Sequence, residues 1–138
     1  MKILAADTTT DVLSLCVWDS GVIAAETIVT CARTHTERLM ATVDWVLREA
    51  GLTLPQVDAL AVSKGPGSFT GLRVGVAAMK GLALGAGLPL VGVPTLVDPP
   101  ALFAYGHAWT VPLPTYVALI GLIAVGMSPV FDLRPVTV

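Results

Sequence analysis

Residues 65–75 read GPGSFTGLRVG, and this stretch joins an apolar run at 57–63 to a segment rich in Gly, Ala and Leu. Gly65 and Gly67 permit backbone conformations that are barred to other residues, and Pro66 stiffens the turn between them. The loop leads into a helix N-terminus, where free backbone N–H groups can hold an anion. The stretch therefore predicts a strand, a turn and a helix, and the turn is either a phosphate-binding loop or a tight structural connection.

Two known nucleotide-binding signatures do not fit this loop. No Gly-Lys-Ser or Gly-Lys-Thr follows at the spacing of a Walker loop, and the glycines do not form the dinucleotide-binding fingerprint. The helix after the loop should begin at Ser68 or Thr70 and end at Ala86. Its interior holds glycines at 71, 75, 81 and 85, each of which costs about 1 kcal/mol relative to alanine. Their four-residue spacing leaves helix surface with few side chains, which suits close packing against the chain's own sheet or against a partner helix.

The rest of the N-terminal part alternates between strand and helix patterns. A second helix should begin near Thr34, where Thr34 and Glu37 can form a capping box, and end before Gly51. Short β-rich runs bounded by turn residues predict the strands. These expected strands are 2–6, 12–18, 22–29, 57–63 and 89–93. The order β-β-β-α-β-α-β predicts an α/β fold with a mixed sheet and two crossover helices.

Composition limits the classes of function. The net charge is −2 and the five arginines are scattered, so no basic patch for nucleic acid is visible. Cys16 and Cys31 are too few for a disulfide framework and lack zinc-site spacing, which favours a reducing, cytoplasmic environment. The N-terminus carries Lys2 and then Asp7 and Asp11 among its apolar residues, so it is not expected to be a secretory signal.

Several motifs in this order resemble the TsaB (YeaZ) family. They are Asp7-Thr8-Thr9 after the first strand, His35-Thr36-Glu37-Arg38-Leu39 at a helix start, GPGSFTGLRVG at 65–75, Lys80-Gly81-Leu82-Ala83 and Leu88-Pro89-Leu90-Val91-Gly92-Val93. The continuation Ser-Phe-Thr-Gly-Leu-Arg separates TsaB from its catalytic relative TsaD. The resemblance covers nearly all of residues 1–96.

The resemblance implies an actin-like, RNase-H-like (ASKHA) N-terminal lobe and a role in tRNA threonylcarbamoyladenosine synthesis. Members of the family act as non-catalytic accessory subunits that bind a TsaD-like catalytic partner and work with a TsaE-like ATPase. ATP is then expected only at the level of the complex, and tRNA is contacted only indirectly. The resemblance also implies pairing through the two helices of the lobe, with a second copy or with TsaD.

The first turn is the candidate nucleotide site. Asp7, Thr8 and Thr9 stand where actin-like ATPases place their first phosphate-binding turn, but no glycine lets the backbone approach phosphate closely. A complete ATP site would also need a second lobe. His35 and His107 are the two histidines and lie in unrelated segments, so a TsaD-like pair of histidine ligands is not expected. We therefore predict no metal site and no catalytic residue.

Candidate partner contacts come from the two expected helices. Trp45 lies opposite the apolar face of the first helix, where a tryptophan is either an interface anchor or a ring lying across its own helix. The second helix contributes the remaining candidates. These are Phe69, Arg73, Gly71, Gly75 and Met79.

The chain changes character after Leu96. Residues 97–138 carry three of the eighteen charged side chains and six of the ten prolines, and the second lobe expected of TsaB does not follow. We predict domains at 1–96 and 97–138, the latter an apolar, proline-rich tail from a frameshift or truncation. Translating the DNA in all three frames tests this origin. The run 116–127 has twelve apolar or glycine residues, short of the roughly 20 needed for a membrane span.

Three other functions remain open from the sequence. Two are enzymes: a small actin-like ATPase or phosphotransferase, and a glycoprotease-like peptidase. Either would need a second lobe or a metal cluster. The third is a module attached to a membrane through the tail, which cell fractionation would test. We favour the accessory subunit.

Overall fold

The structure is a computed structural model and describes residues 1–31 and 34–95. Its elements are β1 (Lys2–Asp7), β2 (Val12–Asp19), β3 (Val22–Thr30), α1 (His35–Glu49), the 3₁₀ turn η1 (Leu54–Gln56), β4 (Ala59–Ser63), α2 (Phe69–Ala86) and β5 (Leu90–Val93). The predicted order of strands and α-helices is confirmed, and η1 is an addition. The predictions made for 97–138 lie outside the described residues.

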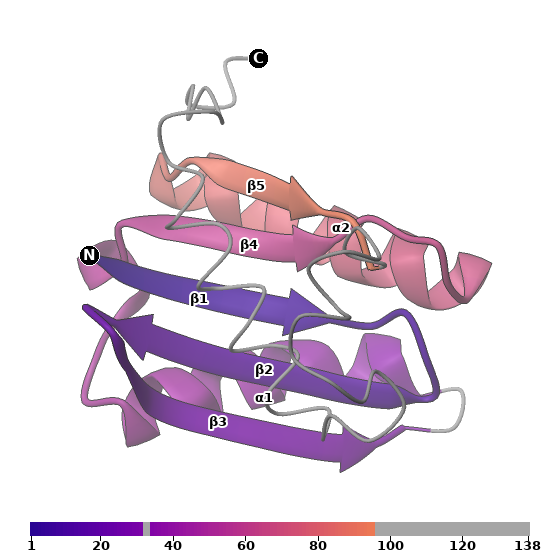
Figure 1. Ribbon diagram of the computed structural model, residues 1–138, viewed down its shortest axis with the longest axis horizontal. Helices are drawn as coiled ribbons and strands as arrows, with labels where there is room; N and C mark the ends of the chain where they lie inside the picture. The colour runs from indigo at the N-terminus through magenta and orange to yellow at the C-terminus, as the bar shows by residue number, and fades with distance from the viewer. Residues whose placement is uncertain (32–33, 96–138) are drawn as a thin grey trace, which may run out of the picture.

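The five strands form one mixed sheet in the order β3-β2-β1-β4-β5 (Figure 1). The hairpins β1–β2 and β2–β3 are antiparallel, whereas β4 runs parallel to β1 and β5 runs parallel to β4. The carboxyl ends of β1, β4 and β5 therefore meet at one edge of the sheet. The first turn and the loop before α2 both start from this edge.

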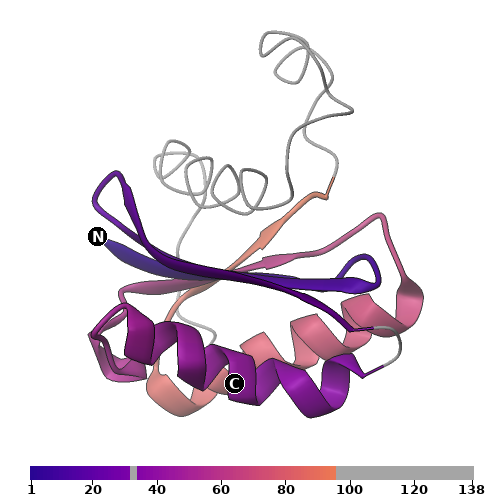
Figure 2. The same ribbon diagram turned by 90° about the horizontal axis from the view of Figure 1, so that it is seen from below.

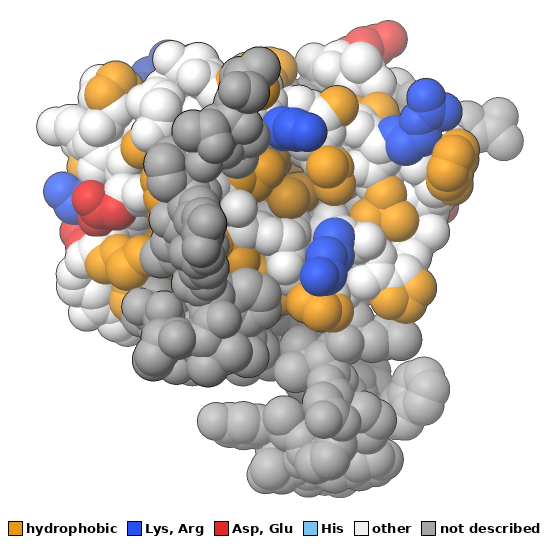
Figure 3. Space-filling model, turned by 90° about the horizontal axis from the view of Figure 1, so that it is seen from above, with side chains coloured by type: hydrophobic (Ala, Val, Ile, Leu, Met, Phe, Trp, Pro, Cys, Tyr) orange, Lys and Arg blue, Asp and Glu red, His pale blue; other side chains and the backbone are white. Residues whose placement is uncertain are grey.

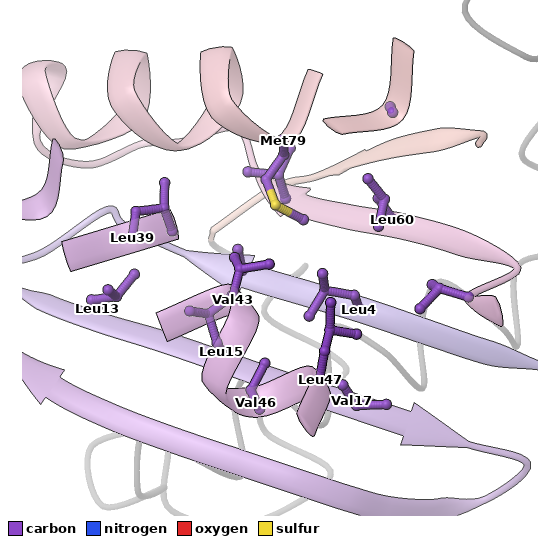
Figure 4. Packing of buried hydrophobic residues seen from close by; sticks show 14 of the residues in the cluster. Leu4, Leu13, Leu15, Val17, Leu39, Val43, Val46, Leu47, Leu60 and Met79 are labelled. Carbon is purple, nitrogen blue, oxygen red and sulfur yellow. The ribbon is translucent and has the colours of Figure 1, made fainter. Parts of the chain in front are cut away.

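Both α-helices cover the same face of the sheet (Figure 2). α1 packs over β2 and β3, and α2 packs mainly over β4. The core between the layers contains Leu4 and Leu15 from the sheet, Leu39 and Val43 from α1 and Met79 from α2, all nearly inaccessible to solvent (Figure 4). This burial fixes the two helices over opposite halves of the sheet.

The opposite face of the sheet also carries apolar side chains. A second buried cluster includes Ile3, Cys16, Trp18, Ala61 and Val91, which alternate along their strands with the residues of the first core. Burial is the main cause that raises the pKa of the Cys16 thiol to about 12, and the negative charge of Glu26 adds to it. Cys16 and Cys31 are both free and buried, as their apolar setting predicts.

The helix ends differ from the sequence prediction in one respect. Thr34 occupies the N-cap of α1, but its side chain makes no capping hydrogen bond, so the predicted capping box with Glu37 is wrong. A box of this kind forms instead at η1, where the backbone N–H of Thr53 donates to Oε1 of Gln56 at 2.8 Å. In α2, Oγ of Ser68 accepts from the backbone N–H of Gly71, and Gly87 ends the helix with a positive φ of 67°.

Within residues 1–31 and 34–95, neither helix combines the length and the apolar character that crossing a membrane requires.

Candidate functional site

The first turn and the start of α2 are joined by hydrogen bonds at the carboxyl edge of the sheet. Oγ1 of Thr8 donates to the backbone carbonyl of Gly71 at 2.8 Å, and the backbone N–H of Ser68 donates to the carbonyl of Thr9 at 2.7 Å. Both threonines are buried. We call this set of contacts between residues 8–9 and 67–75 the clamp.

Three glycines in the loop and helix make the clamp possible. A Cβ at Gly67 would lie 2.5 Å from Cβ of Thr9. At Gly71 it would collide with the carbonyl oxygen of Thr8, and at Gly75 with the Thr8 hydroxyl. Gly65 is needed for another reason, since its φ of 101° is in the left-handed region. The glycines of GPGSFTGLRVG are thus accounted for by packing and by turn geometry.

Asp7 lies at the end of β1 and is 4 % exposed. Its Oδ1 accepts from the backbone N–H of Thr9 at 2.8 Å. Ser14 lies opposite it on β2, and Ser63 ends β4, the neighbouring strand on the other side. The hydroxyls of Thr9, Ser14 and Ser63 have no hydrogen-bond partner among the described residues. This polar end of the sheet can accept and donate hydrogen bonds.

The three residues predicted for nucleotide contact therefore fall into two groups, Thr8 on one side and Asp7 with Thr9 on the other. Thr8 is completely buried, and its hydroxyl is engaged with α2, so its place in the structure is accounted for by the clamp. Asp7 and Thr9 retain oxygen atoms without a described partner. Nucleotide contact by Asp7 and Thr9 stays a prediction.

His35 begins α1 and is buried, with Nε2 lacking a described hydrogen-bond partner. His107 lies outside the described residues. Across the described ranges, no group of three or more His, Cys, Asp or Glu side chains is arranged to hold a metal ion.

The predicted partner contacts on α2 fall on opposite sides of the helix. Gly71, Gly75 and Met79 are buried, the glycines against Thr8 and Met79 within the core, so these three face the protein's own sheet. Their assignment as partner contacts is corrected accordingly. Phe69 is 74 % exposed, and the guanidinium carbon of Arg73 lies 5.3 Å from its ring centroid. These two side chains are available on the surface.

Trp45 lies on α1 away from the buried side of the helix and is 44 % exposed. It lines a shallow groove of about 280 Å³ between α1 and β3, together with Thr27, Glu37, Arg38, Ala41 and Thr42. The candidate contacts predicted from sequence therefore belong to two separate surfaces, one along α2 and one between α1 and β3.

Two of the glycines that the sequence analysis placed in this helix lie on the outer side of α2. Gly81 and Gly85 are exposed, and an added Cβ at either would meet no atom of the described residues within 4 Å. Leu84 beside them is 41 % exposed. The four-residue spacing of the glycines was visible, but it does not show that the first two face inward and the last two outward.

Comparison with known proteins identifies relatives of two kinds. The profile of the family described as TsaD, tRNA N6-adenosine threonylcarbamoyltransferase, matches residues 27–99. The tRNA threonylcarbamoyladenosine biosynthesis protein TsaB of Escherichia coli (strain K12) is 45 % identical over 97 residues, which are 70 % of this chain and 42 % of that protein. The tRNA N6-adenosine threonylcarbamoyltransferase of Cereibacter sphaeroides (strain ATCC 17025) is 49 % identical over 79 residues, 57 % of this chain and 20 % of that protein. This chain therefore spans less than half the length of either relative.

Solved structures agree on the fold. YeaZ from Pseudomonas aeruginosa superposes with a TM-score of 0.64 at 35 % identity, over 67 % of this chain and 43 % of that chain. RuvC of T. thermophilus, solved with a Holliday junction, gives a TM-score of 0.66 at 17 % identity, over 99 % of both chains. The second likeness concerns the fold alone. Together they confirm the actin-like, RNase-H-like fold that the sequence predicts.

Proposed function

This chain belongs to the TsaB (YeaZ) family, within the wider group covered by the threonylcarbamoyltransferase profile, and from that membership we propose that it is an accessory subunit in tRNA threonylcarbamoyladenosine synthesis. It acts without catalysis of its own, by binding a TsaD-like catalytic partner. The observation that carries the proposal is the 45 % identity to TsaB of E. coli over 97 residues. Because the chain spans 42 % of that relative, the proposal covers the contribution of this lobe.

The outer side of α2 is the surface we assign to the partner. It presents Phe69 with Arg73 stacked on it, and farther along the helix it presents Leu84. Basic side chains lie singly among hydrophobic ones on the side of the molecule formed by α2 and β5 (Figure 3). Aromatic residues and arginine dominate the binding energy of many interfaces. An exposed aromatic with an aligned guanidinium is therefore a suitable anchor.

The comparisons support the choice of a TsaD-like partner. Transferases of that name match 79 residues of this chain at 49 % identity, so such a partner contains a stretch closely related to this lobe. Related lobes can pair through equivalent faces, as identical subunits do in two-fold dimers. The open glycines Gly81 and Gly85 would let a partner helix approach α2 closely.

The remaining parts of the proposal follow from the family. The complex works in the cytoplasm with a TsaE-like ATPase, and ATP and tRNA are handled by the assembled complex. Asp7 and Thr9 contact nucleotide only if the chain retains part of an ancestral site. The sequence contains no run of basic residues of the kind that would indicate direct binding to tRNA.

Copurification tests the proposal directly. The full chain, coexpressed with the TsaD of its own organism, should copurify with it, and the isolated chain should show no ATPase, peptidase or transferase turnover. The double variant Phe69→Ala with Arg73→Ala should reduce partner affinity by roughly tenfold or more. The matched control is Asp44→Ala with Arg48→Ala, which removes an exposed ion pair from α1. Metal-dependent turnover by the isolated chain would refute the accessory role.

A second candidate is the transferase itself. It is favoured by the family profile over residues 27–99 and by the named transferases. The accessory subunit and the transferase can be distinguished by adding the chain to a threonylcarbamoyl-transfer reaction that contains every component except TsaD. Threonylcarbamoyl transfer to tRNA under those conditions would favour the transferase, and its absence would favour the accessory subunit.

A further inference from the structure

We propose that residues 116–127, which we call the apolar segment, pack against the face of the sheet opposite the two α-helices. They would supply the layer that the described helices do not provide there. The inference does not depend on the proposed function, and this face is separate from the outer side of α2. It rests on the apolar character of the face, on its size and on the place where the chain leaves the sheet.

The face opposite the helices is apolar and buried across four strands. The second buried cluster draws its side chains from β2, β1, β4 and β5, and each of them is 7 % exposed or less. We call this cluster the outer patch. Both α-helices lie on the other face of the sheet (Figure 2), so neither of them covers the outer patch. Leaving apolar surface in water costs about 25 cal/mol per Å², so this face needs a covering layer.

The outer patch has clear limits on two sides. On β3, Glu26 is exposed and Ile28 is 44 % exposed, although the residues that they pair with on β2 are buried. At the carboxyl edge of the sheet the patch is followed by a polar row of Ser14, Asp7 and Ser63 on three neighbouring strands. The apolar area therefore extends over four strands, or three spacings of about 4.8 Å, which is roughly 14 Å.

The apolar segment matches the outer patch in length and in chemistry. It has twelve apolar or glycine residues and no charged side chain. Twelve residues extend about 18 Å as a helix and farther as a strand, so either conformation reaches across the patch. The middle of the patch contains the small side chains of Ala5 and Ala61. They leave room for the larger side chains of the segment, such as Leu119 and Ile120.

The chain leaves the sheet beside this face. β5 ends at Val93, whose side chain belongs to the outer patch. Residues 94–115 then connect β5 to the apolar segment, and a chain can extend about 3.3 Å per residue, so the connection is long enough to reach any part of the patch. The cost of closing such a loop grows only slowly with its length. A tethered segment also has a high effective concentration, which favours it over a separate molecule.

The two cysteines report separately on the two faces of the sheet. Cys16 belongs to the outer patch, whereas Cys31 belongs to the core beneath the helices. A thiol reacts as its thiolate and only where a reagent reaches it, so in the full wild-type chain a maleimide should label both roughly tenfold or more slower than in urea. Mass spectrometry of the labelled peptides measures each rate. In the same chain, the amide hydrogens of residues 116–127 should exchange slowly with deuterium.

Three aspartates in the apolar segment should uncover Cys16 alone. Leu119→Asp, Ile120→Asp and Gly121→Asp are combined in one variant, because three successive side chains of a helix or strand cannot all point away from the sheet. Since a carboxylate is costly to bury against apolar surface, the segment should detach, and labelling of Cys16 should become roughly tenfold or more faster. Labelling of Cys31 should stay slow, because its core lies on the other face.

The matched control combines Val136→Asp, Thr137→Asp and Val138→Asp, which adds the same charges outside the apolar segment and should leave both labelling rates unchanged. Fast labelling of Cys16 in the wild type, fast amide exchange in the segment, or a protected Cys16 in the first variant would each overturn the proposal. So would protection that disappears on dilution, which would assign the cover to a second copy. If the first variant exposes both cysteines equally, it has unfolded, and the wild-type labelling and exchange rates decide.

Discussion

The two halves of α2 contain the same residue type at the same spacing and put it to opposite uses. Gly71 and Gly75 lie against Thr8, where no side chain fits, whereas Gly81 and Gly85 face outward, and none of the described residues lies near the position of a Cβ there. Each glycine weakens the helix by about 1 kcal/mol relative to alanine. The clamp offsets the cost of the first pair, whereas no contact among residues 1–31 and 34–95 offsets the cost of the second. Close packing among the described residues therefore explains the first pair of glycines in α2 and leaves the second pair for another role.

The largest expected effect is at Gly71. Gly71→Ala places a methyl group against the carbonyl oxygen of Thr8, which cannot move without breaking the clamp. We expect a loss of about 3 kcal/mol in the free energy of unfolding despite the gain in helix propensity. Urea denaturation of the full chain measures it. A variant as stable as the wild type would show that the two ends of α2 do not differ in this way.

A smaller effect is expected from Thr8→Val, which keeps the shape of the side chain and removes its hydroxyl. The carbonyl of Gly71 then loses its side-chain donor in a buried position, at a cost of about 1–2 kcal/mol. The same denaturation experiment applies. Thr10→Val is the control, because the Thr10 hydroxyl bonds only to nearby exposed backbone. Equal losses in the two variants would argue against a special contribution from the clamp.

The smallest effect has the opposite sign. Gly81→Ala and Gly85→Ala should each stabilise the chain by about 0.5–1 kcal/mol, since the new methyl group meets no atom in the described part of the chain and the helix gains propensity. Thermal denaturation should show a raised midpoint. If the bare surface serves a partner, Gly81→Leu should keep this stability while weakening copurification with the TsaD-like protein. Destabilisation by either alanine would contradict the comparison.

The sequence was sufficient for the order and approximate limits of the strands and α-helices, because hydrophobic periodicity reports which side of each element is buried. The sequence was not sufficient for features that depend on contacts between residues distant along the chain, such as the capping of a helix end. Thr34-x-x-Glu37 and Thr53-x-x-Gln56 have the same capping pattern, yet only the second forms a box. Local pattern could not distinguish them.

The candidate site shows the same limit more sharply. Phe69 and Arg73 were predicted as surface contacts and are exposed, but Met79 and the first glycines were grouped with them although they face inward. Helical spacing gives which residues share a face, and the direction of that face depends on where β1 lies. The polarity of a side chain normally indicates whether its position on a helix is buried or exposed. Glycine has no side chain, so it gives no such indication.

The bond from the Thr8 hydroxyl to Gly71 spans 63 residues and sets an order of events during synthesis. β1 can pair with β2 as soon as the first hairpin leaves the ribosome, since the two are adjacent in the chain. Its other edge must wait for β4, and its first turn must wait for α2. Until then the nascent chain exposes an apolar strand edge, the kind of surface on which chaperones act. The lobe can close only after most of its residues have been translated.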